Sequence, residues 1–163
     1  MITLYRTENK QIYEKLKLLL PADSQINRTE NGKPHTDGIC FSITHTGDTA
    51  LIAISDLPIG IDAEIVRERS FSSVLKSFTA REQTEIGENI TTFLMHWVVK
   101  EAYIKLTGGM LAHDLKRLEY YGGKLYCDGA ETNCNMLCSS SDDLIYCVCA
   151  ECEIPPNLKM EIL

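Results

Sequence analysis

The sequence has no long apolar run. No stretch reaches the roughly 18 residues of a membrane-spanning helix, so we expect no membrane partner. Met1 is followed by ITLYRTENK, without a charged segment that leads into an apolar one, and this start predicts no secretory signal. Low-complexity segments and internal repeats are also missing. These absences favour a cytoplasmic, globular protein.

Positive charge is scarce as well. The sequence has 16 Lys and Arg residues against 23 Asp and Glu, which gives a formal net charge of −7. This balance disfavours a general nucleic-acid-binding protein. An acidic partner would need a local basic patch, and the best candidate patch comprises Arg67, Arg69, Lys76 and Arg81. We therefore expect no nucleic-acid partner.

The seven cysteines are concentrated towards the C-terminus. Their odd number, without an export signal, predicts reduced thiols. The spacings Cys134 to Cys138 and Cys149 to Cys152 are compatible with a structural zinc site. Cys147 and Cys149, however, lie in LIYCVCA, an expected strand with both thiols on one face, where cysteine acts as a small hydrophobe. Core thiols are the favoured interpretation, and zinc is the alternative.

Length and patterning predict an α+β fold. A chain of 163 residues with 44% hydrophobic content suits one medium domain or two fused small halves. We expect strands over 2–6, 39–44, 49–55, 59–64, 118–121, 124–127 and 144–150. We expect helices over 10–20, from 70 or 72 to 76–78, after a capping box of Thr79 and Glu82, and from 91 or 92 to 106. This order suggests antiparallel sheet packed by a few helices.

The last of these helices contains WVVKEAYIK and carries two charges where apolar residues belong. Its spacings place on one stripe Leu94, Val98, Glu101 and Lys105. An acid and a lysine on such a stripe are costly to desolvate unless they serve each other or a bound ligand. The alternative is a solvated i,i+4 pair worth a few tenths of a kcal/mol.

Two further carboxylates, Asp62 and Glu64, project from the same face of their expected strand. Neighbouring carboxylates raise each other's pKa unless a cation lies between them, and oxygen-only ligands indicate Mg²⁺. Glu101 offers a third carboxylate, Lys105 can neutralise a phosphate, and His45, in an expected turn over 45–48, can meet another. Separately, each signal also fits a solvated strand face or a plain turn histidine. Together they predict a site for Mg²⁺ and a phosphorylated small molecule.

Five stretches, in the family's order, resemble the Sfp-type 4′-phosphopantetheinyl transferases. They are GKPH (32–35), FSITHTGD (41–48), PIGIDAE (58–64), FTAREQ (78–83) and WVVKEAYIKLTGG (97–109). The most specific signal is G-[IV]-D-x-E followed by [WF]-x-x-K-E-[AS]-x-x-K. The preceding S-x-[ST]-H segment separates this type from the short trimeric carrier-protein synthases. The resemblance covers roughly residues 32 to 129.

The resemblance implies a fold of two similar α/β halves in a pseudo-dimer. Residues 1–59 would form a shortened N-terminal half, and residues 60–163 a C-terminal half with the metal and catalytic motifs, as one compact unit. The family transfers the 4′-phosphopantetheine arm of coenzyme A to a serine of an apo acyl or peptidyl carrier protein, releasing adenosine 3′,5′-bisphosphate. Such carriers serve fatty acid, polyketide or nonribosomal peptide biosynthesis. With a shortened N-terminal half, we expect the protein to be either a monomer or a homodimer.

The motif match also implies roles for the acidic residues and lysines. Asp62, Glu64 and Glu101 would hold Mg²⁺ on the pyrophosphate. Glu101 would also act as the general base on the serine hydroxyl, directly or through a water, and Lys105 would contact the phosphate under attack. Lys100 points to a different helix face, so we interpret it as support or solvated surface and not as a ligand.

The remaining roles concern coenzyme A. Thr44 and His45 would meet phosphates from the other side of the site. Lys33, Pro34 and His35 would line its adenine and 3′-phosphate end. In place of the basic residues that the family keeps in its longer N-terminal half, the candidates here are Lys10, Lys15, Lys17 and Arg28. Two alternatives to the transferase are a non-catalytic coenzyme A or nucleotide-binding relative and a Mg²⁺-dependent phosphohydrolase.

Overall fold

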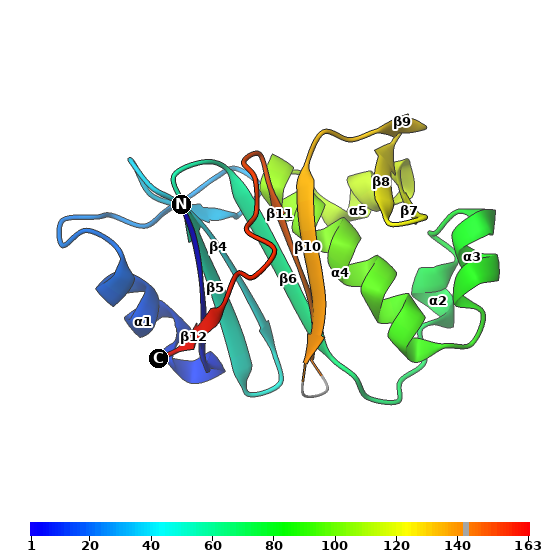
Figure 1. Cartoon of the computed structure of the whole chain (residues 1–163), viewed down its shortest axis with the longest axis horizontal. Helices are drawn as coiled ribbons and strands as arrows, with labels where there is room; N and C mark the ends of the chain where they lie inside the picture. The colour runs from blue at the N-terminus through cyan, green and yellow to red at the C-terminus, as the bar shows by residue number, and fades with distance from the viewer. Residues whose placement is uncertain (142–143) are drawn as a thin grey trace.

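Two main β-sheets build the centre of the molecule (Figure 1), and the computed structural model describes residues 1–141 and 144–163. The first sheet has the order β12-β1-β5-β4, with β12 Met160–Ile162, β1 Ile2–Glu8, β5 Thr49–Ser55 and β4 Cys40–Thr46. The second has the order β10-β11-β6, with β10 Asn135–Ser141, β11 Leu144–Ala150 and β6 Ile59–Ile65. All neighbouring strands are antiparallel except β12, which runs parallel to β1. The predicted α+β class is confirmed.

The edge strands β4 and β6 lie side by side and are joined by hydroxyl groups. The backbone amide of Ile61 donates to Ser42 Oγ (3.1 Å), and that of Ile65 donates to Thr46 Oγ1 (3.2 Å). Side-chain hydroxyl groups of β4 thus accept the hydrogen bonds of β6 amides that would pair with backbone carbonyls in a regular β-ladder. Apolar side chains of both sheets, such as Leu51 and Val148, share one buried cluster. This packing fixes the position of β6 relative to β4.

The α4 helix, Ile90–Thr107, covers the other face of the second sheet. Its approach depends on Gly60, because a Cβ there would lie 2.0 Å from the carbonyl oxygen of Ala102. Asn89 caps the helix, with its side chain accepting from the Thr92 amide (3.0 Å), so the predicted start at residue 91 or 92 is wrong. Gly108 ends the helix in the left-handed region, at φ +71°.

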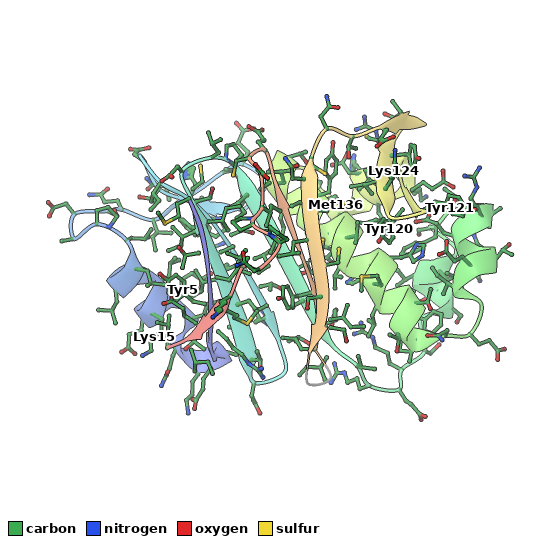
Figure 2. All side chains as sticks on the ribbon, in the orientation of Figure 1. Tyr5, Lys15, Tyr120, Tyr121, Lys124 and Met136 are labelled. Atoms are coloured by element: carbon green, nitrogen blue, oxygen red, sulfur yellow. The ribbon has the colours of Figure 1, made fainter. Side chains whose placement is uncertain are left out.

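Shorter elements surround this centre. They are the 3₁₀ helices η1 Asn9–Gln11 and η2 Leu115–Arg117, the helices α1 Ile12–Leu19, α2 Ser72–Leu75, α3 Ala80–Ile86 and α5 Leu111–Asp114, and the strands β2 Asn27–Arg28, β3 Pro34–His35, β7 Leu118–Tyr121, β8 Lys124–Cys127 and β9 Ala130–Glu131. Tyr5, on β1, lies on the side of the first sheet that α1 covers (Figure 2). Within the described residues, no helix has the length and apolar character needed to cross a membrane.

Local patterning predicted most elements, and the errors have local causes. The predicted bounds of β5, β7, β8 and β11 are confirmed, as is the capping box of Thr79 and Glu82. Asn9 does not cap a helix over 10–20, because its side chain donates to the Gly47 carbonyl and residues 9–11 form a 3₁₀ turn. Neither Ser70 nor Ser72 caps α2, which follows Phe71. Five strands were not predicted, namely β10, β12 and the two-residue strands β2, β3 and β9.

Candidate active site

Asp62 is the centre of the predicted site, and it is buried. Its side chain points from β6 towards α4 and is 6% exposed. Asp62 Oδ1 accepts from Lys105 Nζ at 2.7 Å and from Thr44 Oγ1 at 2.9 Å. Burial raises the pKa of Asp62, while the Lys105 ammonium and the Thr44 hydroxyl act in the opposite direction. Thr44 was predicted to meet a phosphate, and in this structure its hydroxyl group contacts Asp62.

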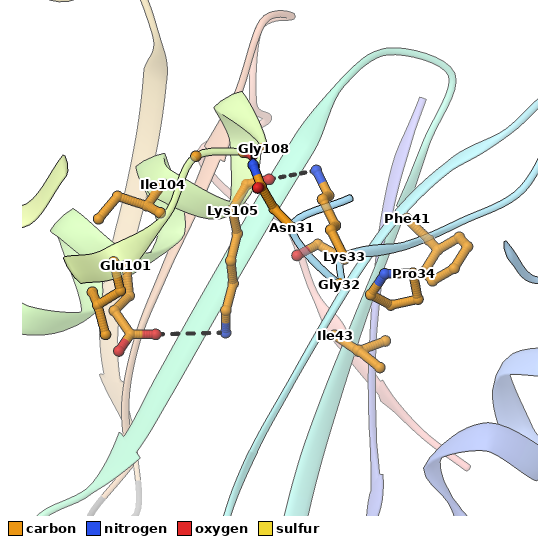
Figure 3. A pocket seen from close by; sticks show the side chains of 13 residues that line it. Asn31, Gly32, Lys33, Pro34, Phe41, Ile43, Glu101, Ile104, Lys105 and Gly108 are labelled. Carbon is orange, nitrogen blue, oxygen red and sulfur yellow. Dashed lines mark hydrogen bonds and ion pairs between the residues drawn. The ribbon is translucent and has the colours of Figure 1, made fainter. Parts of the chain in front are cut away.

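Glu101 faces the same space from α4. Its Oε2 lies 3.9 Å from Lys105 Nζ, and the two side chains are only 20% and 28% exposed (Figure 3). Burial raises the pKa of Glu101 to about 7, the Asp62 charge adds to this rise, and Lys105 opposes it. The alternative of a solvated surface pair does not fit this burial. Glu101 is instead a partly buried carboxyl group with a pKa near neutral pH.

The third carboxylate, Glu64, lies further along the same face of β6. Thr46 Oγ1 donates to Glu64 Oε2 at 3.2 Å, and Arg69 lies 3.2 Å from Oε1. We call Asp62, Glu64, Glu101 and Lys105 the carboxylate cluster. Arg69 was predicted only as part of a basic patch. Its spacing from Glu64 in sequence gives no periodic signal that would have revealed the ion pair.

A cavity of about 250 Å³ adjoins Glu101 and Lys105. Lys33 and Pro34 line its opposite wall, and Lys33 Nζ donates to the Lys105 carbonyl oxygen (Figure 3). Burial lowers the pKa of Lys33. Asn31, which the sequence did not single out, donates from Nδ2 to the Gly108 carbonyl at 2.8 Å. The loop around GKPH is therefore attached to the C-terminal end of α4.

Two predicted residues lie apart from these contacts. His45 is exposed and sits within β4, so its prediction as a turn residue is wrong. Strand alternation directs it away from the face that carries Thr44. His35 is also exposed and lines a neighbouring hollow on the far side of Lys33 and Pro34. The structure brings Thr44, Lys33 and Pro34 to the site and leaves the two histidines at its periphery.

A second group of charges lies deeper against the same helix. Glu82 accepts from Lys100 Nζ at 2.7 Å and from the Tyr120 amide at 2.9 Å, and His96 Nδ1 is 3.2 Å away. We call Glu82, His96 and Lys100 the buried ion-pair cluster. Burial alone would raise the pKa of Glu82, but these hydrogen bonds outweigh it and hold the pKa at about 2. Lys100 also lies over the Phe78 ring, with Nζ 3.9 Å from its centroid.

Lys100 therefore has the supporting role that was predicted, but it is not solvated. Its side chain is 0% exposed, and burial lowers its pKa while Glu82 partly offsets this. The sequence signal for Glu82 was its place in the capping box, where it also accepts from the Thr79 amide at 2.9 Å. One carboxylate thus caps α3 and anchors α4.

The donor chemistry of the carboxylate cluster fits Mg²⁺, since it offers only oxygen ligands and an excess of negative charge. The side chains are not gathered into a ready cage, however. Among residues 1–141 and 144–163, no three His, Cys, Asp or Glu side chains are arranged to hold a metal ion. The cations of Lys105 and Arg69 lie against Asp62 and Glu64 instead. The cysteines within these described ranges likewise form no group of three that could hold zinc.

The comparisons with known proteins agree with the predicted family. Residues 58–125 match the family model described as 4'-phosphopantetheinyl transferase superfamily. The chain is 32% identical over 122 residues to the 4'-phosphopantetheinyl transferase psf-1 of Bacillus pumilus, covering 69% of this chain and 51% of that protein. It is 32% identical over 87 residues to the 4'-phosphopantetheinyl transferase gsp of Aneurinibacillus migulanus, covering 50% and 37%.

A vertebrate protein is similar over a comparable stretch. The L-aminoadipate-semialdehyde dehydrogenase-phosphopantetheinyl transferase of Xenopus laevis is 29% identical over 127 residues, covering 64% of this chain and 42% of that protein. The chain thus matches about half, or less, of the length of these curated relatives. The family match contains the D-x-E strand and the whole of α4, which carry all three carboxylates. The chain belongs to the 4′-phosphopantetheinyl transferase superfamily.

Proposed function

We propose that this protein transfers the 4′-phosphopantetheine arm of coenzyme A to a serine of an apo acyl or peptidyl carrier protein. The observation that carries the proposal is the meeting of Asp62, Glu64, Glu101 and Lys105 between β6 and α4, beside a cavity. The products are the holo carrier protein and adenosine 3′,5′-bisphosphate. Transfer of this kind depends on positioning and charge neutralisation more than on covalent catalysis.

Mg²⁺ is the proposed cofactor, with Asp62, Glu64 and Glu101 as its protein ligands. When bound, it neutralises charge on the pyrophosphate of coenzyme A. Lys105 now lies on Asp62, and Arg69 lies on Glu64. Both cations must give up these carboxylates for a metal to be held there. The freed Lys105 ammonium is then available to a phosphate oxygen.

Glu101 is the proposed general base. Its pKa of about 7 means that the carboxylate can accept the proton of a serine hydroxyl near neutral pH, directly or through a water. Thr44, held on Asp62, keeps that carboxylate oriented. The buried ion-pair cluster holds α4 in place through the hydrogen bond from Lys100 to Glu82, and the position of α4 sets the direction in which Glu101 projects.

Two hollows flank the cluster and suit the two ends of coenzyme A. The cavity beside Glu101 combines the Lys33 ammonium with the apolar Phe41 and Ile43, as an adenine and a phosphate require. A smaller groove of about 170 Å³ borders Glu64 and is lined by Phe93 and Trp97. Its apolar walls fit an extended pantetheine arm. The division into a shortened half, 1–59, and a second half, 60–163, stays a prediction.

The direct test is to incubate the protein with coenzyme A, Mg²⁺ and a panel of apo carrier proteins and to weigh the carriers. We expect one carrier or more to gain one phosphopantetheine group, with dependence on Mg²⁺. The matched control is Glu101→Gln, which keeps the side-chain shape and removes the charge. No gain in mass across a broad panel, from folded protein, would contradict the proposal.

A non-catalytic coenzyme A-binding role is the second candidate. It is favoured by the positions of Lys105 and Arg69, which already neutralise two of the three carboxylates. Calorimetry separates the two roles, because this candidate requires coenzyme A binding without any transfer. Release of phosphate or phosphopantetheine without a carrier would instead indicate the phosphohydrolase alternative.

A further inference from the structure

Two cysteines face each other across the second sheet. Cys138 of β10 and Cys147 of β11 are directly opposite in register, and their sulfur atoms are 2.9 Å apart. Opposite residues of antiparallel strands have Cα atoms about 4.5 or 5.5 Å apart. Both separations lie within the roughly 4.4–6.8 Å that disulfides span. The backbone is therefore already placed for a bond between these two residues.

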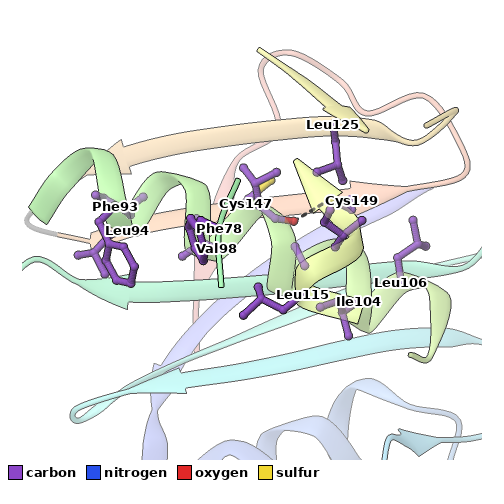
Figure 4. Packing of buried hydrophobic residues seen from close by; sticks show 14 of the residues in the cluster. Phe78, Phe93, Leu94, Val98, Ile104, Leu106, Leu115, Leu125, Cys147 and Cys149 are labelled. Carbon is purple, nitrogen blue, oxygen red and sulfur yellow. Dashed lines mark hydrogen bonds between the residues drawn. The ribbon is translucent and has the colours of Figure 1, made fainter. Parts of the chain in front are cut away.

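The strand register distinguishes this pair from the neighbouring thiols. Cys149 is opposite Met136, which carries no thiol, and Cys149 Sγ points to the Val99 carbonyl of α4 (3.9 Å; Figure 4). Cys134 precedes β10 and contacts the Thr132 hydroxyl at 3.3 Å. Among the described cysteines, only Cys138 and Cys147 share a cross-strand position. The Cys149 thiol also interacts with the thiols of Cys134 and Cys147, but neither residue is opposite Cys149 in the strand register.

The two thiols differ in access. Cys138 is partly exposed, whereas Cys147 is buried in the core under α4, and this burial raises the pKa of its thiol. Cys138 is therefore the thiol that an oxidant in solution meets first, with Cys147 in contact behind it. The same cross-strand row continues from Cys147 to Asp62 on β6. The pair thus lies one strand away from the carboxylate cluster.

We propose that Cys138 and Cys147 are a redox-active dithiol that a small disulfide such as glutathione disulfide converts to an intramolecular disulfide. The Cys138 thiolate attacks one glutathione sulfur, the glutathione S–S bond breaks, and the released thiolate takes up the proton that Cys138 lost. Cys147 sulfur then attacks Cys138 sulfur and displaces the second glutathione, which leaves with the Cys147 proton. Two protein thiols are oxidised, and one glutathione disulfide is reduced to two glutathione molecules.

The test treats the folded, reduced protein with glutathione disulfide. One part is then weighed directly, and another is unfolded in excess alkylating reagent to count its free thiols. We expect the seven free thiols to fall to five and the chain to lose the mass of two hydrogen atoms. Cleavage before aspartate separates Cys138 from Cys147 in sequence, so their disulfide holds two peptides together until reductant is added. Fragmentation of the linked pair identifies the bonded residues.

Matched variants make the result specific. Cys138→Ser is expected to keep its remaining thiols free or in mixed disulfides with glutathione, with no linked peptides. Cys134→Ser, at another partly exposed cysteine of the same region, is expected to form the bond as the native chain does. The reduced forms of both variants serve as folding controls by circular dichroism.

Three results would overturn the inference. One is a folded, oxidised protein that keeps all seven thiols or carries only glutathione adducts. Another is a bond that maps to Cys134 and Cys149. The third is stoichiometric zinc in the purified protein, released only when these thiols are blocked. None of these readouts involves transfer, so the inference stands or falls separately from the proposed function.

Discussion

The two charge clusters that α4 helps to form differ in their balance of positive and negative charge, although Lys100 and Glu101 are neighbours in sequence. In the buried ion-pair cluster, the Glu82 carboxylate is matched by the Lys100 ammonium and by further hydrogen bonds. In the carboxylate cluster, three carboxylates share one lysine and an arginine from the rim. A buried charge without full compensation costs stability. The balanced cluster is what a structural support requires, and the unbalanced one is what a cation-binding site requires.

The largest expected effect tests the unbalanced cluster. Glu101→Gln should lower carrier modification about 10²–10⁴-fold, because it removes the proposed base. Loss of a proposed metal ligand adds to this. The rate is measured by mass spectrometry at saturating Mg²⁺ and coenzyme A. Turnover near that of the native chain would exclude both roles for Glu101.

The next effect tests the balanced cluster. Glu82→Gln should destabilise the protein by about 3–5 kcal/mol in urea unfolding, because it leaves the Lys100 charge buried without its partner. The double variant Glu82→Gln with Lys100→Met should recover most of this loss, since it removes the unpaired charge. If the single and double variants are equally unstable, the ion pair is not the cause.

A smaller effect concerns pH and the metal. The folded pKa of Glu101, about 7, lies above its ordinary value of 4.5. The folded state therefore binds the Glu101 proton more tightly than the unfolded state does. Without Mg²⁺, the stability contributed by protonated Glu101 is fully present below about pH 4.5 and is lost as pH rises through 7. The loss is about 3 kcal/mol.

Glu101→Gln is the matched variant for this pH effect, because the amide does not titrate. Without metal, it should be more stable than the native chain at pH 8 and nearly equal to it at pH 4.5. Mg²⁺ should raise the melting temperature of the native chain and leave that of the variant almost unchanged. Identical pH profiles for the two proteins would show that Glu101 is not held in its neutral form.

The smallest effect serves as a control for helix stability in general. Asn89→Ala removes the N-cap of α4, which belongs to neither cluster, and should cost about 1 kcal/mol. Because neither cluster loses a charge, the stabilisation by Mg²⁺ should persist. If the variant loses this stabilisation, any destabilisation of α4 affects Mg²⁺ binding, and the two clusters do not have separate roles.

Local periodicity explains how much of the fold could be predicted. Strand alternation predicted that Asp62 and Glu64 share a face, and the capping box predicted the start of α3. The β10 strand was missed because NMLCSSS has no alternation of apolar and polar residues. Its position follows from pairing with β11, which is not a local property. His45 was placed in a turn for a similar reason, since β4 is extended to residue 46 by its pairing with β5.

The sequence by itself determined which side chains share a stripe on α4 and a face on β6, because helix and strand periods are fixed by neighbours in the chain. It did not determine what these side chains contact. The pairing of Lys105 with Asp62, and of Lys100 with Glu82, depends on the depth at which α4 packs on β6. That depth is set by Gly60, where the absence of a side chain lets two distant segments touch. Tertiary packing alone therefore decided which of two adjacent charges became a support and which became part of the site.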